Sequence, residues 1–314
     1  MTNRIQRFIA FLLVLCIPIF AIAGCTNNDV ANAANQVTTN ANGAYSIDTK
    51  TTTPEGKLDV YMLDIGQGDA ILLKVDDEYS MIDTGDIEHR ENIVAQLKAM
   101  GVTKLKNIII THPHADHMGG FYAIVKAMPI EHVYDDGIAV DNNMYKTYEK
   151  WIEKNKIQRT TLRSGDVVDF GHGAVFIVYA PWVEPLTDKK GETDLNNNSI
   201  VGKLIFGKFS MLFTGDAELQ EEKKLIKEQN SRLFSRILKV GHHGSRTSSS
   251  EDFLKSIKPE SALISNGMYN KYGHPHDVTL RRLQENNIAI YRTDTMGRIH
   301  ISTDGNEWQI TTER

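Results

Sequence analysis

Three histidines and one aspartate occur within six residues of the sequence, at His112, His114, Asp116 and His117. They follow an apolar segment, residues 107–110, that predicts a short strand, so they lie where backbone leaves a sheet and side chains can converge. Imidazole and carboxylate groups suit Zn²⁺ and other first-row metals. In an extended turn, His112 and His114 point to one side, while Asp116 and His117 reach a second position. The motif therefore predicts a site for two ions rather than one.

The same residue types recur at two later points in the sequence. Asp216 follows an apolar strand at residues 210–213, and His242 and His243 follow another at residues 236–240. His274 and His276 lie in a polar loop that contains Gly and Pro. These two either bind substrate or protonate the leaving group, or they form only a hydrogen-bonded turn. Seven of the 11 histidines fall in these three motifs, which indicates a shared chemical role.

Short strands and amphipathic helices surround these motifs. The periodicity predicts strands at 58–65, 70–75, 79–82, 107–110, 174–179, 200–206, 210–213, 236–240, 261–264, 288–292, 298–302 and 308–311. It predicts helices at 89–100, 120–128, 142–155, 219–229, 251–257 and 277–286. Groups of strands followed by strand–helix pairs in both halves favour an α/β fold with two packed sheets and helices outside them.

The His-x-His-x-Asp-His motif resembles that of the metallo-β-lactamase superfamily, and further segments match in the expected order. These are Asp83-Thr84-Gly85, Gly215-Asp216 and Val240–Ser245, and the resemblance covers nearly all of residues 58–312. It implies an αββα sandwich of two mixed sheets with helices on the outer faces. It also implies that Asp83 orients metal ligands by hydrogen bonds, that Asp216 bridges both ions, and that a late histidine completes the second site.

The ligand set follows from this resemblance. Aligning the family's usual ligand-x-small pattern favours His242 over His243, which leaves His243 to contact phosphate or act as a general acid. Many relatives supply a further histidine from the loop that here contains only Leu195, three asparagines and Ser199, so we expect an open first site that phosphate oxygens complete. The expected metal ligands are His112, His114, Asp116, His117, Asp216 and His242, and the expected catalytic residues are Asp116, Asp216, His243 and His276.

Within the superfamily, the run from Asp64 to Ala70 is similar to the opening of the hydrolase domain of the competence protein ComEC. Residues 197–199 and 270–276 are similar to that branch as well. The resemblance places Asp64 beside Asp83 in a supporting role. It also suggests substrate contacts from Asn198, Ser245, Lys271 and His274. ComEC carries this domain on a multi-pass membrane channel that has no counterpart here, so DNA uptake is not implied.

The leading hypothesis is phosphodiester hydrolysis by a hydroxide that two divalent ions share, with Zn²⁺ favoured and Mn²⁺ possible. The substrate is either extracellular DNA or an envelope or small-molecule diester. A second class, amide or lactone hydrolysis including β-lactams, predicts a complete three-histidine first site. A third class is a non-catalytic surface lipoprotein with a relict site, which would be expected to have lost ligands.

The first 24 residues have the pattern of a bacterial lipoprotein signal peptide. Arg4 and Arg7 precede an apolar run at 8–23, and small residues lead to Cys25. The pattern predicts cleavage before Cys25, a lipid on Cys25, and anchoring to the outer face of the membrane. The alternatives are a soluble secreted protein and an uncleaved anchor. Residues 25–56 are rich in Asn, Thr and Ala and predict a flexible tether, and residues 57–314 form the hydrolase domain.

The charge of the chain limits its partners. The formal net charge is −5, and residues 1–24 contribute two arginines and no acid, so the remainder is more acidic still. General nucleic-acid binders usually carry a basic surface. The acidic net charge therefore argues against sequence-independent DNA binding over the whole surface, although it does not exclude a local basic groove. No obligate protein partner is inferred.

Overall fold

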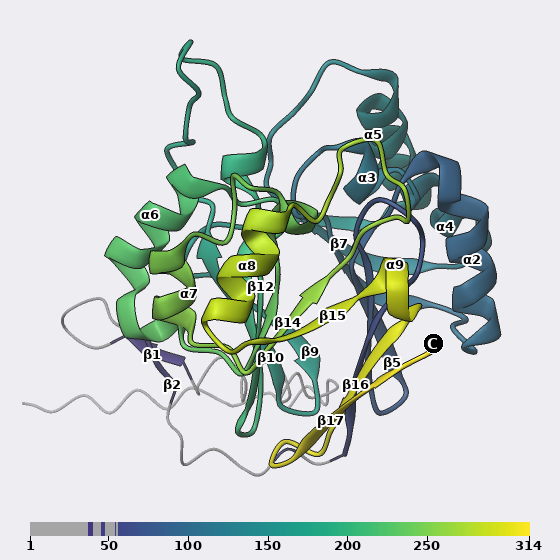
Figure 1. Ribbon diagram of the computed structural model, residues 1–314. Coiled ribbons are helices and arrows are strands. Elements are labelled where there is room, and N and C mark those ends of the chain that lie inside the picture. Colours follow the sequence, from purple (N-terminus) through teal and green to yellow (C-terminus); the bar gives the residue numbers. More distant parts are fainter. Residues whose placement is uncertain (1–36, 40–44, 48–53, 55) are drawn as a thin grey trace, which may run out of the picture.

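The computed structural model describes residues 37–39, 45–47, 54 and 56–314 (Figure 1). The predicted signal peptide and Cys25 lie outside the described residues. Within the predicted tether, β1 (Val37–Thr39) pairs with β2 (Tyr45–Ile47) in an antiparallel hairpin. Among the described residues, none of the helices combines the length and the hydropathy that a membrane crossing requires.

Two mixed sheets form the centre of the fold, as the sequence predicts. The first sheet has the strand order β17-β16-β3-β4-β5-β6-β7-β8. Its strands are β3 (Leu58–Met62), β4 (Ala70–Val75), β5 (Glu78–Thr84), β6 (Leu105–Ile109), β7 (Ile130–Asp135), β8 (Gln158–Thr161), β16 (Ile299–Thr303) and β17 (Trp308–Thr312).

The second sheet has the order β15-β14-β13-β12-β11-β10-β9. Its strands are β9 (Val167–Gly171), β10 (Ala174–Ala180), β11 (Val201–Phe206), β12 (Phe209–Phe213), β13 (Ile237–Lys239), β14 (Ser261–Ile264) and β15 (Ala289–Arg292). In each sheet, four consecutive strands are parallel and the others pair antiparallel.

Helices cover the outer face of each sheet (Figure 1). Those on the first sheet are α2 (Arg90–Ala99), α4 (Phe121–Ala127) and α5 (Asn143–Asn155), with the short α3 (Ala115–Met118) at the sheet edge. Those on the second sheet are α6 (Leu219–Gln229), α7 (Glu251–Ile257) and α8 (Asp277–Glu285), and the one-turn α9 (Thr293–Met296) follows β15. This is the αββα sandwich that the resemblance implies.

Three apolar clusters hold the layers together. The central cluster lies between the sheets and includes Val60 and Ile82 from the first and Phe176 and Met211 from the second. The other two clusters lie between each sheet and its own helices. Strand β10 is buried along its whole length, as expected for a strand covered on both faces. Burial on this scale gives the strands fixed positions from which polar side chains can project.

The carboxyl ends of the parallel strands position the site. Asp83 lies at the end of β5, Thr111 just beyond β6, Asp216 beyond β12 and Ser265 beyond β14. Parallel strands deliver their carboxyl ends to one edge of a sheet. Contacts between the two edges, such as the 3.1 Å approach of His117 Nε2 to Asp216 Oδ1, show that the sheets present these ends to each other.

Candidate metal centre

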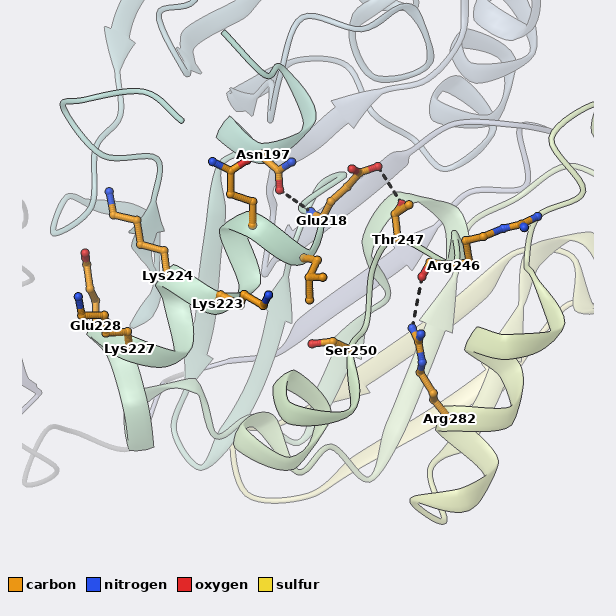
Figure 2. Close-up of a pocket in the computed structure, with 12 residues that line it drawn as sticks. Asn197, Glu218, Lys223, Lys224, Lys227, Glu228, Arg246, Thr247, Ser250 and Arg282 are labelled. Atoms are coloured by element: carbon orange, nitrogen blue, oxygen red, sulfur yellow. Dashed lines mark hydrogen bonds between the residues drawn. The ribbon is translucent and has the colours of Figure 1, made fainter. Parts of the chain in front are cut away.

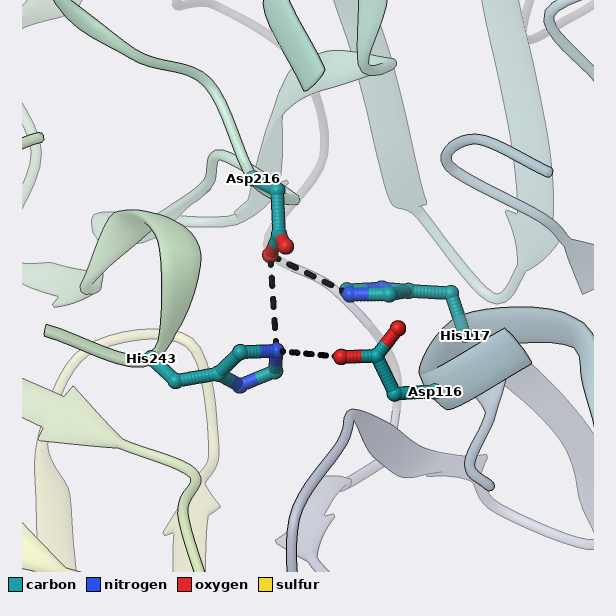
Figure 3. Close-up of side chains that lie close together, drawn as sticks. All are labelled: Asp116, His117, Asp216 and His243. Atoms are coloured by element: carbon teal, nitrogen blue, oxygen red, sulfur yellow. Dashed lines mark ion pairs between the residues drawn. The ribbon is translucent and has the colours of Figure 1, made fainter. Parts of the chain in front are cut away.

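Four side chains from both sheets, Asp116, His117, Asp216 and His243, meet at one point (Figure 3). His117 Nε2 lies 3.1 Å and His243 Nε2 3.6 Å from Asp216 Oδ1, and Asp116 Oδ2 lies 3.3 Å from the same His243 nitrogen. One ligand atom from each of the four residues falls within 4.8 Å of all the others. Two imidazoles and two carboxylates at this spacing can surround a single cation.

A second set of imidazoles faces the other oxygen of Asp216. His242 Nε2 lies 3.7 Å and His112 Nε2 3.9 Å from Asp216 Oδ2. His114 Nδ1 is 3.0 Å from His112 Nε2. The two oxygens of one carboxylate are therefore directed at two separate groups of histidine nitrogens, which is the arrangement of a bridging ligand.

Four of these imidazoles are oriented in the same way, with Nδ1 held by a protein oxygen and Nε2 directed at Asp216. The Nδ1 atoms of His117, His242 and His243 contact Asp83 Oδ2 at 2.7 Å, Glu218 Oε1 at 2.8 Å and the Ser265 carbonyl at 2.9 Å. Nδ1 of His112 lies 3.1 Å from the Thr111 hydroxyl. A hydrogen bond at one ring nitrogen fixes the tautomer and leaves the other nitrogen free to bind metal.

A buried ion pair lies behind the first group. The Lys239 ammonium contacts Asp69 Oδ2 and donates to the Gly215 carbonyl at 3.0 Å, and both side chains are 1% exposed. Asp69, Asp83 and His117 form a further acidic group of suitable size for a cation. Because the Lys239 ammonium contacts that group through Asp69, positive charge is already supplied there, and we do not assign it a metal.

The charges of the cluster are strongly coupled. Burial alone would raise the pKa of Asp216, but the imidazoles of His117 and His243 outweigh it and hold the pKa well below its usual range. Burial would likewise lower the pKa of His117, but Asp216 and Asp83 raise it well above the ordinary value. Negative charge thus concentrates at Asp216, and a divalent ion bound there would take the place of the protons that the imidazoles retain.

The residues present fit such ions. His117 Nε2, His243 Nε2 and Asp216 Oδ1 are buried and have no hydrogen-bond partner. Unpartnered buried polar atoms are rare and call for an explanation, and here three of them converge on one point. A pocket of about 350 Å³ opens onto this cluster and is also lined by Gln67, Asn196, Tyr272 and His274.

Comparison with known families agrees with this geometry. Residues 63–267 match the model of the metallo-beta-lactamase superfamily. The chain belongs to the metallo-β-lactamase superfamily. Family membership and the His/Asp groups together indicate a metal-dependent hydrolase.

Two curated bacterial proteins are similar to this superfamily member. Competence protein ComA of Neisseria gonorrhoeae is 30% identical over 247 residues, covering 78% of this chain and 32% of that protein. ComE operon protein 3 of Bacillus subtilis is 30% identical over 264 residues, covering 78% of this chain and 33% of that protein. The chain therefore spans about a third of the length of these curated relatives.

A solved structure shows the same fold. The metallo-beta-lactamase fold protein YhfI from Bacillus subtilis superposes with a TM-score of 0.52 at 12% sequence identity, over 79% of this chain and all of YhfI. At this identity the likeness concerns the fold alone.

In this metallo-β-lactamase site, the structure adds His243 to the predicted ligand His242. The structure brings His243, not His242, into the group with Asp116, His117 and Asp216. Both residues have left-handed backbone angles, with φ of 48° and 52°, in the turn Gly241–Gly244. This turn directs both rings inward. His242 thereby reaches the Oδ2 side of Asp216, where the asparagine-rich loop supplies no histidine.

Two further predicted residues have structural roles instead. Asp64 lies at the end of β3 and pairs with Arg314 at 3.0 Å, whereas the buried acid near the metal centre is Asp69, after the Gly66–Gly68 turn. Asn198 is fully buried, and its amide bonds to the backbone of Leu186 and Asp194. It holds the loop in place and has no free polar atom for substrate.

The remaining predicted residues divide between the pocket and its surroundings. His274 lines the pocket, and burial together with the neighbouring imidazoles of His243 and His242 lowers its pKa to about 4. His276 stands at the start of α8, where its Nδ1 accepts the Arg246 N–H at 3.0 Å. Ser245 bonds to Thr247, and Lys271 lies over the Tyr272 ring. His276, Ser245 and Lys271 therefore do not line the pocket.

Asp83 is placed as the resemblance implies, since its carboxylate accepts the Thr111 N–H and hydroxyl and contacts His117.

Three residues that support the metal centre were not predicted from the sequence: Asp69, Glu218 and Lys239. A signal existed for Lys239, because a lysine inside the apolar run Ile237–Val240 requires a buried partner. Which partner it has depends on the packing of the two sheets.

Proposed function

We propose that this chain is a phosphodiesterase that uses two divalent ions, Zn²⁺ or Mn²⁺, at the Asp216 centre. The observation that carries the proposal is the placement of Asp216, whose Oδ1 faces His117 and His243 while its Oδ2 faces His112 and His242. Paired divalent ions supply positive charge for phosphoryl oxygens and lower the pKa of water towards about 7. Enzymes with such pairs include phosphatases and nucleases.

The residues of the chain have separable roles in this hydrolysis. His117, His243 and Asp116 would hold one ion and His112, His114 and His242 the other, with Asp216 shared. A water oxygen bonds to phosphorus, the ester P–O bond breaks, and the leaving oxygen takes up a proton. His274 lines the pocket as a neutral ring at neutral pH, so it would act as a hydrogen-bond donor to substrate. This is the substrate contact that the sequence suggests for His274, whereas the proton donation suggested for His276 is not assigned here because His276 does not line the pocket.

Nearby charge favours an anionic substrate over a neutral lactam or lactone. Arg246 is exposed directly after the turn that carries His242 and His243, and three lysines of α6 line an adjacent groove. Positive side chains beside a metal site attract phosphate esters and give no advantage to uncharged amides.

The test is hydrolysis of bis-p-nitrophenyl phosphate by the full chain with Zn²⁺, with Mn²⁺ and with chelator. We expect metal-dependent turnover that falls at least about 10³-fold in Asp216→Asn, while circular dichroism shows an intact fold. Turnover that persists in chelator, or an Asp216→Asn variant with wild-type activity, would exclude the metal mechanism. Hydrolysis of a lactam with none of the diester would instead support the amide class.

From the N-terminal sequence alone, we also propose anchoring through a lipid on Cys25. A labelled fatty acid supplied to the producing bacterium should be incorporated into the wild type and not into Cys25→Ala, and a wild type without label would contradict the proposal.

A further inference from the structure

A groove of about 860 Å³ runs along α6 on the outer side of the second sheet (Figure 2). Lys223, Lys224 and Lys227 line one wall, and Arg246 and Arg282 line the other (Figure 2). Two acidic residues, Glu218 and Glu228, also line it. The α6 groove is therefore locally cationic in a chain whose net charge is −5, so its charge does not follow from the overall composition.

Two of these cations are available for a ligand. Lys223 and Lys227 are exposed, and within the described part of the chain neither makes a hydrogen bond or an ion pair. They lie four residues apart on α6, about 6 Å along the helix axis. Arg282, by contrast, donates to the carbonyls of the loop at Ser248. A row of unpaired lysines at helical spacing can meet successive charges of an extended polyanion.

The acids of the groove are already engaged. Glu218 Oε1 contacts His242 Nδ1 and accepts the Thr247 hydroxyl, both at 2.8 Å. Glu228 accepts the indole N–H of Trp182. The contact with His242 also connects the α6 groove to the metal centre, because Nε2 of the same ring faces Asp216. The groove therefore ends one side chain away from the proposed reacting group.

Exposed apolar residues gather on the other side of the site. Met268, Tyr269 and Tyr272 are 59%, 97% and 52% exposed, in the loop between β14 and α8. We call these three residues the aromatic loop. Tyr272 lines the metal-centre pocket, and the exposed Leu219 lines the α6 groove. The Tyr272 ring stacks on His274 and has the Lys271 ammonium over it. Tyr269 makes no ring contact within the described part of the chain, so its ring offers the face on which an unpaired base can stack.

We propose that the α6 groove binds the phosphate backbone of single-stranded nucleic acid while the aromatic loop stacks a base, so that one diester lies at the metal centre. The inference rests on the proposed phosphodiesterase function and extends it to a polymeric substrate. A cationic groove combined with aromatic faces is how proteins bind single strands without sequence preference. A sugar- or glycerol-phosphate polymer would use the lysines, but it has no base to stack on Tyr269.

The test compares the full-length wild type with the double variant Lys223→Glu/Lys227→Glu. Binding of a fluorescent, non-hydrolysable single-stranded oligonucleotide is followed by anisotropy over a range of salt concentrations. We expect the Kd of the variant to rise at least about tenfold, and the slope of log Kd against log salt to fall by about 1.4, since each lost phosphate contact removes about 0.7. Tyr269→Ala should weaken binding without changing this slope, and Tyr269→Phe should restore it.

The matched control is Lys150→Glu/Lys154→Glu on α5, which changes the same charge at the same spacing on exposed residues of the other helical layer. It should bind like the wild type. Equal losses in both double variants would overturn the proposal, as would tighter binding of poly(glycerol phosphate) than of the oligonucleotide. Hydrolysis of bis-p-nitrophenyl phosphate reports separately on the proposed function. If the wild type cleaves this small diester but binds no oligonucleotide, the proposed role of the α6 groove is wrong and the proposed phosphodiesterase function is unaffected.

Discussion

Lys239 carries a charge that is buried beneath the metal centre, with Asp69 as its partner. The pair joins β13 of the second sheet to the turn before β4 of the first, and Asp69 Oδ1 lies 3.6 Å from Nδ1 of His243. Removing one member of a buried ion pair leaves the other charge without compensation. The pair therefore affects both the packing of the sheets and the orientation of a proposed ligand.

Lys239→Met should lower the free energy of unfolding by about 3–5 kcal/mol, because Asp69 would remain buried and unpaired. The measurement is urea denaturation of chelator-treated protein. Lys239→Met combined with Asp69→Leu should recover more than half of the loss, since no uncompensated charge remains. A single variant as stable as the wild type would show that the pair is not coupled to the fold.

The sequence predicted the residues of the centre better than their individual roles. His112, His114, Asp116, His117 and Asp216 could be singled out because their types are wrong for a core and their spacing suits metal. Which oxygen of Asp216 each of His242 and His243 faces could not be predicted, because it depends on two consecutive left-handed residues. The predicted substrate contact of Asn198 differs from its structural role, because the sequence does not show whether an asparagine amide is buried and hydrogen-bonded to backbone or free to bind substrate.

At the scale of elements, the turn after β12 determines where Asp216 points. Gly215 has a φ of +47°, and a Cβ there would lie 2.8 Å from Ser199 Cβ. The Ser199 hydroxyl accepts the Asp216 N–H at 3.0 Å. This turn therefore needs glycine both for its backbone angle and for its close approach to the neighbouring loop.

Gly215→Ala should destabilise the fold by roughly 2–4 kcal/mol and reduce diester hydrolysis at least about tenfold, because Asp216 must shift to relieve the clash. Gly101→Ala is the matched control, since its φ is +80° and no atom lies within 4 Å of the added Cβ. It should cost only about 1 kcal/mol and keep full activity. Thermal unfolding and turnover, measured on both variants, separate the clash from the backbone strain.

Most helices and strands were predicted within one or two residues, and α6, α7, β4 and β14 have the predicted bounds. Two of the missed elements, β8 and α3, lack a periodic signal, whereas the missed strands β7 and β9 contain buried apolar residues. Strand β8 (Gln158–Thr161) is exposed at every position, so no apolar residue marks it. Helix α3 has only four residues, too few to show a helical period. Strand order could not be predicted because it depends on contacts between the ends of the chain, such as β16 beside β3.

A second, partly buried cation lies in the described part of the chain, on the strand before the one that leads to Asp216. Lys203 on β11 donates to the carbonyls of Arg232 and Phe234, and burial lowers its pKa to about 8. The folded state therefore favours the neutral amine more than the unfolded chain does. A base with a lowered folded-state pKa lowers stability at pH values where it must be charged, and this penalty disappears as pH rises.

The unfolding free energy of wild type relative to Lys203→Met should rise between about pH 8 and about pH 10.5, by on the order of 1–3 kcal/mol. The comparison uses chelator-treated protein, so that metal release does not contribute, and the other titrating groups cancel between the two proteins. A difference that is flat over this range would show that Lys203 titrates as a solvated lysine.

The central claim is that Asp216 bridges two ions, with His243 at one and His242 at the other. The most direct test is the metal content of the full chain, measured by mass spectrometry after equilibration with Zn²⁺ or Mn²⁺ and removal of free ion. We expect about two ions per chain in the wild type and in the remote control His132→Ala, about one in His242→Ala and in His243→Ala, and almost none in Asp216→Ala. A wild type that holds one ion or none, or a His242→Ala variant that keeps both, would contradict the account.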